Sequence, residues 1–176
     1  KTYWKNILAE SEPIKNTLAE QYLERMGLNE IECKSLKFHK AVWNRDTQTH
    51  MPALVAQAVG FDENEKVVPK GIQVTYIDPE INTNENLKSQ AKCSGDVDNS
   101  IIMIQKSSQP DNRWFIALNI ESALSIAKAN PDIRVACLTT TEKIDRNPLK
   151  GKDNQLILCI NQDTPQEFVE NASKIF

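Results

Sequence analysis

Apolar residues near the N-terminus repeat at helical spacing. Leu18, Tyr22 and Met26 fall on one face of a predicted helix, and Gly27 is expected to end it because glycine adopts positive φ without strain. Between residues 31 and 105 the period shortens to two. The alternating stretches SLKFH and GIQVTYID flank a continuous apolar run, MPALVAQAVGF, and turn residues separate them. This pattern predicts an antiparallel sheet with hairpin connections. IIMI is expected to be a further strand, and the polar stretch KCSGDVDNS a loop.

After residue 113 the pattern changes again, and apolar strands alternate with helices. WFIAL, IRVACL and LILCI are near-continuous apolar runs, and IESALSIAKANP carries an apolar stripe at helical spacing. A last helix is expected after Thr164, where TPQE has the form of a capping box with proline at the first helical position. Strands that are apolar on both faces and alternate with helices are typical of a parallel sheet.

These patterns together predict an α+β fold in two parts. Residues 1–110 are expected to form N-terminal helices and an antiparallel β region. Residues 111–176 are expected to form an α/β half with parallel strands. The predicted boundary lies at the polar stretch SSQPDNR, which separates the two kinds of pattern.

The composition fits a globular protein and excludes several classes of function. The chain has 176 residues, of which 40% are hydrophobic and 26% charged, so it is able to bury a core. A net charge of −3 gives no molecule-wide attraction for nucleic acid, and any basic surface must be local. No apolar run approaches the roughly 20 residues of a membrane helix. The charged opening KTYWKNILAE does not resemble a signal peptide. We therefore expect a cytoplasmic protein with no membrane partner.

The four cysteines are not spaced for a metal site. They lie at positions 33, 93, 137 and 159, no two form a CxxC pair, and only His39 and His50 are available to join them. Cys137 and Cys159 lie inside apolar runs. We expect buried free thiols in a reducing compartment.

Polar residues follow two of the predicted parallel strands, where ligands of open α/β sheets bind. The first strand ends in ALNIE and the second in INQD. The stretches WFIALNIESALSIA and ILCINQD resemble the Toprim domain, most closely that of plasmid and phage primases and of conjugal-transfer relaxases. There the first strand ends in A-E-G-I-E-[ST]-A-L-S and the later one in D-x-D. TLAEQYLERMGL, LKFH, MPALVA and KCSGDV resemble, in the same order, the region that precedes Toprim in those proteins.

The resemblance implies a Mg²⁺ site for nucleotidyl transfer or phosphodiester cleavage, held by a glutamate and two aspartates. The family glutamate position is Leu118 here, and the first aspartate is Asn161. Asp163 and the motif's second acid, Glu121, remain. No cofactor is expected, and any Mg²⁺ bound by Glu121 and Asp163 is expected to be held weakly. Both acids also have ordinary structural explanations: Glu121 at a helix start, stabilised by about 0.3–1 kcal/mol, and Asp163 in a turn.

A local basic cluster offers a second candidate site. It combines four cations with an aromatic residue, a combination that suits single-stranded nucleic acid, although a solvated strand face is the simpler explanation. The residues are Lys34, Lys37, Lys40, Trp43 and Arg45.

The resemblance implies a bacterial, cytoplasmic module of a conjugative DNA-transfer protein, truncated at the C-terminal end of its Toprim-like part. We expect it to have lost catalysis and to contact single-stranded DNA or other domains of a larger transfer protein. Two alternatives remain open. One is an active Mg²⁺-dependent primase or nucleotidyl-transfer domain that uses Glu121 and Asp163. The other is a purely structural or dimer-forming domain.

Overall fold

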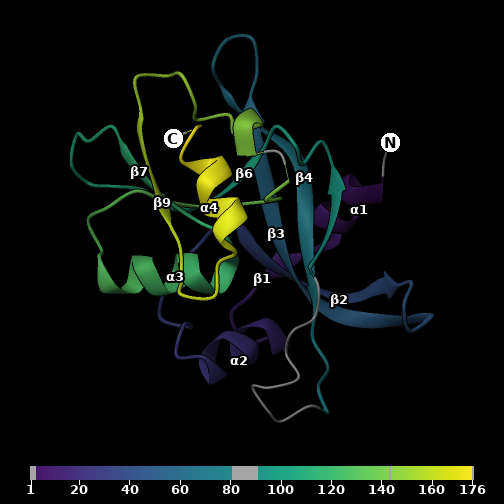
Figure 1. The fold of residues 1–176 in the computed structure, drawn as a ribbon. Helices are drawn as coiled ribbons and strands as arrows, with labels where there is room; N and C mark the ends of the chain where they lie inside the picture. The colour runs from purple at the N-terminus through teal and green to yellow at the C-terminus, as the bar shows by residue number, and fades with distance from the viewer. Residues whose placement is uncertain (1–2, 81–90, 143, 176) are drawn as a thin grey trace.

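The computed structural model describes residues 3–80, 91–142 and 144–175, which form a mixed α+β fold (Figure 1). Its helices are α1 (Tyr3–Glu10), α2 (Leu18–Arg25), α3 (Ile120–Ala129), α4 (Gln166–Ala172) and the short 3-10 helix η1 (Ile144–Arg146). Its strands are β1 (Glu12–Pro13), β2 (Leu36–Asn44), β3 (Thr49–Phe61), β4 (Val67–Tyr76), β5 (Lys92–Gly95), β6 (Ile101–Gln105), β7 (Arg113–Ala117), β8 (Val135–Leu138) and β9 (Gln155–Cys159). Within the described residues, no helix is long and apolar enough to span a membrane.

The strands form one sheet in the order β1-β2-β3-β6-β8-β7-β9, with β4 and β5 beyond the other edge of β3. Every pairing among β1 to β6 is antiparallel. Strand β7 pairs in parallel with both β8 and β9. The predicted antiparallel region and the predicted parallel strands are therefore confirmed.

Strand β3 links the two parts of the sheet. One of its edges pairs with β4 from Ala53 to Phe61. The other edge pairs with β2 as far as Ala56 and with β6 at Val59. Strand β6 then pairs antiparallel with β8. The sheet is thus continuous across residue 110, and the predicted division into two parts stays a prediction.

Helices α2 and α3 lie on the same side of the sheet and share one apolar cluster (Figure 1). Leu23 of α2 and Leu124 of α3 belong to it together with Leu54 of β3. Alternate residues of β3, Ala53 and Val55, face the cluster that contains Ile7 of α1. The apolar residues of α4 pack against a further cluster on β7 and β8. The sheet is therefore covered by helices on both faces.

The stretch KCSG forms strand β5, so the prediction of a loop there was wrong. Its side chains are polar and gave no strand pattern, but its backbone pairs with β4. Two glycines make this pairing close: Gly95 lies opposite Gly71 and has φ +107°, a conformation that favours glycine. A Cβ atom added to Gly95 would overlap the carbonyl oxygen of Lys70 and the Cα of Gly71.

Replacing Gly95 by alanine is expected to lower the free energy of unfolding by about 2–4 kcal/mol, from backbone strain and overlap together. Urea denaturation measures the loss. The matched control is Gly27→Ala, because Gly27 also has positive φ but nothing lies within 4 Å of its missing Cβ. Strain alone there should cost about 1–2 kcal/mol. Equal losses in the two variants would show that the β4–β5 approach contributes nothing.

The capping box predicted before the last helix was also wrong. Helix α4 begins at Gln166 with Pro165 at its N-cap and no side-chain cap. The Thr164 hydroxyl instead donates to Asn161 Oδ1 at 2.8 Å and accepts from the Asn161 N–H at 3.1 Å. The hydroxyl is used to close the turn that follows β9 and is not free to cap the helix.

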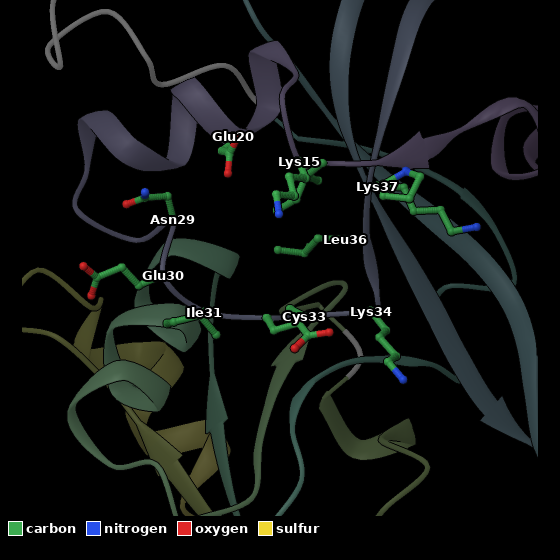
Figure 2. A pocket seen from close by; sticks show the side chains of 12 residues that line it. Lys15, Glu20, Asn29, Glu30, Ile31, Cys33, Lys34, Leu36 and Lys37 are labelled. Atoms are coloured by element: carbon green, nitrogen blue, oxygen red, sulfur yellow. The ribbon is translucent and has the colours of Figure 1, made fainter.

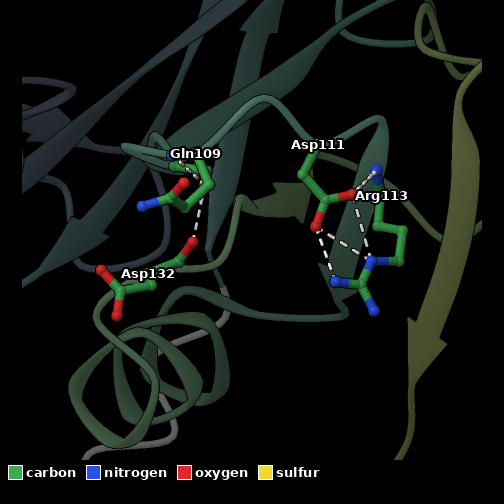
Figure 3. Close-up of polar contacts among 5 residues, drawn as sticks. Gln109, Asp111, Arg113 and Asp132 are labelled. Carbon is green, nitrogen blue, oxygen red and sulfur yellow. Dashed lines mark hydrogen bonds and ion pairs between the residues drawn. The ribbon is translucent and has the colours of Figure 1, made fainter.

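An ion pair between Asp111 and Arg113 lies at the amino end of β7 (Figure 3). The Asp111 carboxylate accepts from the Arg113 guanidinium at 2.8 Å and from the Arg113 backbone N–H at 2.8 Å. These hydrogen bonds lower the pKa of Asp111 to about 2. The pair lies at the opposite end of the strand from the polar residues that follow Ala117.

Candidate functional site

A shallow cleft of about 360 Å³ opens where β7 and β9 end. The two strands run in parallel with Ala117 opposite Cys159, so the residues that follow them come side by side. The lining residues are Leu118, Asn119, Glu121, Ser122, Ser125, Ile126, Cys159, Ile160 and Asn161. Three of the four residues assigned to the Mg²⁺ motif therefore meet in one cleft, and Asp163 is not among its lining residues.

Helix α3 begins at the edge of this cleft. Asn119 is its N-cap, and its Oδ1 accepts from the Ser122 N–H at 2.8 Å. Glu121 lies in the first turn, where a carboxylate is favoured by the helix dipole. Asn119 is thus occupied by capping, and Glu121 is the one carboxylate among the lining residues.

Glu121 is held by a residue from the distant N-terminal part of the chain. The Tyr22 hydroxyl of α2 donates to Glu121 Oε1 at 2.8 Å, and Tyr22 is only 2% exposed. Burial of the hydroxyl, and next the charge of Glu121, raise the pKa of Tyr22 well above its usual value. The hydroxyl therefore stays a donor over the whole physiological range, and one oxygen of Glu121 is engaged.

Asp163 lies in the turn after β9 and is exposed. That turn closes through the Thr164 N–H, which donates to the Asn161 carbonyl at 3.2 Å. The Asn161 side chain is itself bonded to the Thr164 hydroxyl. The stretch INQD therefore forms a compact turn in which Asn161 borders the cleft and Asp163 does not.

The residues at this cleft do not fit a Mg²⁺ ion. Mg²⁺ in proteins is bound through carboxylates and keeps several waters. Leu118 supplies no oxygen, Asn161 is neutral, and Glu121 is already bonded to Tyr22. In the described parts of the chain, no three side chains of His, Cys, Asp or Glu are grouped so as to hold a metal ion.

The cysteines differ in burial more than the sequence predicted. Cys33 and Cys137 are buried, whereas Cys159 is half-buried in the cleft and Cys93 is exposed. All four are free thiols. Burial raises the pKa of Cys137, and the charge of Glu121 adds to the effect. A buried thiol with a raised pKa is inert, so Cys137 is a packing residue.

The basic residues assigned to nucleic acid fall into two groups along β2. Lys34 and Lys37 line a pocket of about 640 Å³ between α2 and β2, together with Lys15 (Figure 2). Glu20 and Glu30 line the same pocket, and Glu30 pairs with Lys128 at 3.6 Å. Charges of both signs surround this space. Lys34 and Lys37 themselves form no ion pair with any residue that the structure describes.

Trp43 and Arg45 lie at the far end of β2, where it turns into β3. Lys34 precedes β2 and Arg45 follows it, so the nine residues of the strand, roughly 30 Å of extended chain, separate them. Lys37 borders α1, whereas Trp43 points to the other face, because its neighbour Val42 packs in the cluster of α1. A bulge between His39 and Val42 separates the two groups. The structure thus places Trp43 with Arg45, Lys34 with Lys37, and Lys40 in the bulge between them.

His39 does not contribute to the basic surface. It is buried, its Nδ1 accepts from the Ala41 N–H at 3.1 Å, and its Nε2 faces Glu10 Oε2 at 3.3 Å. Because Nδ1 is an acceptor, Nε2 is left as the donor toward Glu10. His39 joins β2 to α1, which is a structural role.

Sequence reasoning missed three residues at these sites. Tyr22 was assigned to an apolar helix face, and its partner Glu121 lies 99 positions away. His50 packs edge-on against Trp43 with ring centroids 5.0 Å apart, and Tyr76 donates its hydroxyl to the Trp43 carbonyl at 2.8 Å. The pairing of His50 with Trp43 is a cross-strand contact, which a hairpin register correctly drawn from the sequence would have revealed.

None of the curated proteins is recognisably similar to this chain in sequence. One family model does match, over residues 1–104, which is more than half of the chain. The match covers α1 to β5 and nearly all of β6, and so includes Tyr22, the basic residues of β2 and the β2–β3 hairpin. The cleft at the ends of β7 and β9 lies outside it. The chain therefore belongs to the family described as a domain of unknown function, DUF7146.

Proposed function

We propose that this chain is a Toprim-like module of a conjugative DNA-transfer protein that has lost metal-dependent chemistry and acts by binding. Its ligands are single-stranded DNA and neighbouring domains of the larger protein. The observation that carries the proposal is the chemistry of the cleft at the ends of β7 and β9. Its place is the usual ligand site of an α/β sheet, but its strand ends carry Leu118 and Asn161.

The state of Glu121 supports the loss of catalysis. A general acid or base must reach the proton that it transfers, and a metal ligand must offer a free oxygen. One of the two oxygens of Glu121 accepts a hydrogen bond from Tyr22, which ties the start of α3 to α2 and leaves a single carboxylate oxygen in the cleft for such a role. The contact is well suited to holding two parts of a protein together, and this favours a binding and structural role over the active-enzyme alternative.

The unpaired cations of β2 support DNA binding. Lys40 and Arg45 are exposed, and like Lys34 and Lys37 they form no ion pair with a described residue. A cation without a carboxylate partner is free to neutralise a phosphate and release its counterion. The net charge of −3 opposes association of the whole molecule, so the expected binding is weak and depends on salt.

Fluorescence anisotropy with a labelled single-stranded oligonucleotide tests this part of the proposal. Four phosphate contacts predict a slope of log affinity against log salt of about −3, at roughly 0.7 per contact. Replacing Lys37 and Lys40 together by alanine should make the slope shallower by at least about one. The matched control is Lys106→Ala, because Lys106 is also exposed and forms no ion pair with a residue in the described ranges, but lies after β6.

Three outcomes separate the alternatives. A slope that changes in the double variant but not in the control supports DNA binding through β2. If Lys106→Ala changes the slope by half as much as the double variant does, only overall charge matters, which contradicts the proposal. If the chain shows no binding at low ionic strength, DNA binding is excluded, and a structural or dimer-forming domain becomes the better description.

A further inference from the structure

The hairpin between β2 and β3 projects from the body of the protein at the right of Figure 1 and carries an exposed aromatic pair. Trp43 is 39% exposed, and His50 lies opposite it in the ladder and is also exposed. The rings meet edge-on, with their planes at 63°. Single exposed apolar residues are common on protein surfaces, but Trp43 combines a large aromatic face with a place on a projecting hairpin.

The position of this aromatic pair is fixed by contacts on two sides. The Tyr76 hydroxyl of β4 donates to the Trp43 carbonyl at 2.8 Å. In the turn, Asp46 Oδ2 pairs with Lys92 Nζ of β5 at 3.1 Å. These two contacts join the hairpin to β4 and β5 before any ligand binds.

The charges around the pair are positive. Lys40 and Arg45 have no carboxylate partner among the described residues, and the charge of Asp46 is balanced by Lys92. The turn of the hairpin and the residues beside it are polar: Asn44, Thr47, Gln48 and Thr49. A protein-docking surface needs a contiguous apolar patch, which this hairpin does not offer. One aromatic face among cations suits a nucleic-acid base between phosphates.

We infer that the β2–β3 hairpin is a base-stacking site for single-stranded nucleic acid. Trp43 provides the stacking face, His50 supports that ring edge-on, and Arg45 and Lys40 contact the flanking phosphates. The inference rests on the DNA binding proposed above and deepens it, because it assigns base contacts to one hairpin and leaves Lys34 and Lys37 to the backbone.

The test compares two labelled probes with the full chain: an oligothymidine of about 12 nucleotides and an abasic oligonucleotide of the same length. Stacking requires bases, whereas phosphate contact does not. We expect wild type to bind the thymidine probe about ten-fold more tightly than the abasic one. Trp43→Ala should abolish that preference and leave the salt slope unchanged. Trp43→Phe should retain most of it, and His50→Ala should reduce it in part.

The control is Val67→Ala. Val67 is 51% exposed, and it pairs with Phe61 at the opposite end of β3 from His50. The Val67→Ala variant should bind both probes as tightly as wild type does. Circular dichroism should show that all variants are folded. If wild type binds both probes equally with a normal salt slope, DNA binding stands and the stacking site is overturned. If wild type binds neither probe, both the proposed DNA binding and the stacking site fail. Loss of preference in Val67→Ala would also overturn the assignment.

Discussion

A chain carrying Leu118→Glu and Asn161→Asp together is expected to bind Mg²⁺ and Mn²⁺ at least about ten-fold more tightly than wild type. Both positions line the cleft at the ends of β7 and β9, so the new carboxylates face the same space as Glu121. Affinity for these hard cations rises with the number of charged oxygen ligands. Wild type, with Leu118 and Asn161, should bind only at millimolar concentrations or more weakly. Isothermal titration calorimetry measures both constants.

The same variant should respond to metal in its stability. Carboxylates crowded into one cleft repel one another, and a bound cation relieves that repulsion. At a metal concentration one hundred times the dissociation constant, stabilisation amounts to about 2.7 kcal/mol. A thermal melt with and without Mn²⁺ should therefore show a shift in the double variant and none in wild type.

The control for the restored site is Leu118→Gln with Asn161→Asp. Glutamine matches glutamate in size but adds no charge, so it also reports the cost of removing Leu118 from its packing beside α4. If both versions bind metal alike, charge at position 118 does not matter, and the proposed relation to the Toprim metal site loses its main support. Micromolar binding by wild type would contradict the loss of the site outright.

Replacing Tyr22 by alanine is expected to lower the free energy of unfolding by about 3–5 kcal/mol, as for other large buried aromatic residues. Tyr22 is 2% exposed in the cluster shared by α2 and α3. Tyr22→Phe keeps the ring and removes only the hydroxyl that Glu121 accepts from, so it should cost about 1–2 kcal/mol. The control is Tyr3→Phe, at an exposed tyrosine, which should stay within about 0.5 kcal/mol of wild type.

The pH dependence separates the hydroxyl from the ring. The pKa of Tyr22 is raised in the folded state by burial and by Glu121. Its contribution to stability is therefore fully present below the unfolded pKa of about 10 and declines as the pH rises above that value. Urea denaturation between pH 8 and 11 should show a steeper loss for wild type than for Tyr22→Phe. Parallel curves would mean that the pKa of the Tyr22 hydroxyl is the same in the folded and the unfolded state.

Most of the architecture was readable from periodicity. MPALVAQAVGF has the continuous apolar pattern of a central strand and forms β3, and LILCI pairs in parallel with WFIAL as expected. The errors came from backbone chemistry that side-chain patterns do not report. KCSG is polar, yet its glycines allow the close pairing with β4. Threonine is a common N-cap residue, but the Thr164 hydroxyl is hydrogen-bonded to Asn161 in the turn and does not cap α4.

The candidate sites were predictable only in part, because some of their contacts join residues that are far apart in the sequence. Because they follow adjacent parallel strands, four residues were expected in one cleft: Leu118, Glu121, Asn161 and Asp163. The first three line it, and Asp163 does not. The Tyr22–Glu121 contact joins residues 99 positions apart, and no local pattern predicts such a pair. The division of the basic residues into two groups depends on the bulge in β2, which the sequence does not mark.

The pairing of β6 with β8 also bears on how the chain folds during synthesis. Residues 101–105 leave the ribosome well before residues 135–138, and the helix α3 emerges between them. At roughly 5–20 residues per second, β6 waits about 2–7 s for its partner strand. During that interval β6 has an unpaired backbone edge, and its buried residues Ile101, Ile102 and Ile104 lack the partners that α3 and β8 later supply. Chaperone dependence and cotranslational aggregation should therefore arise in this window, after the family-matched part has been made and before β8 has emerged.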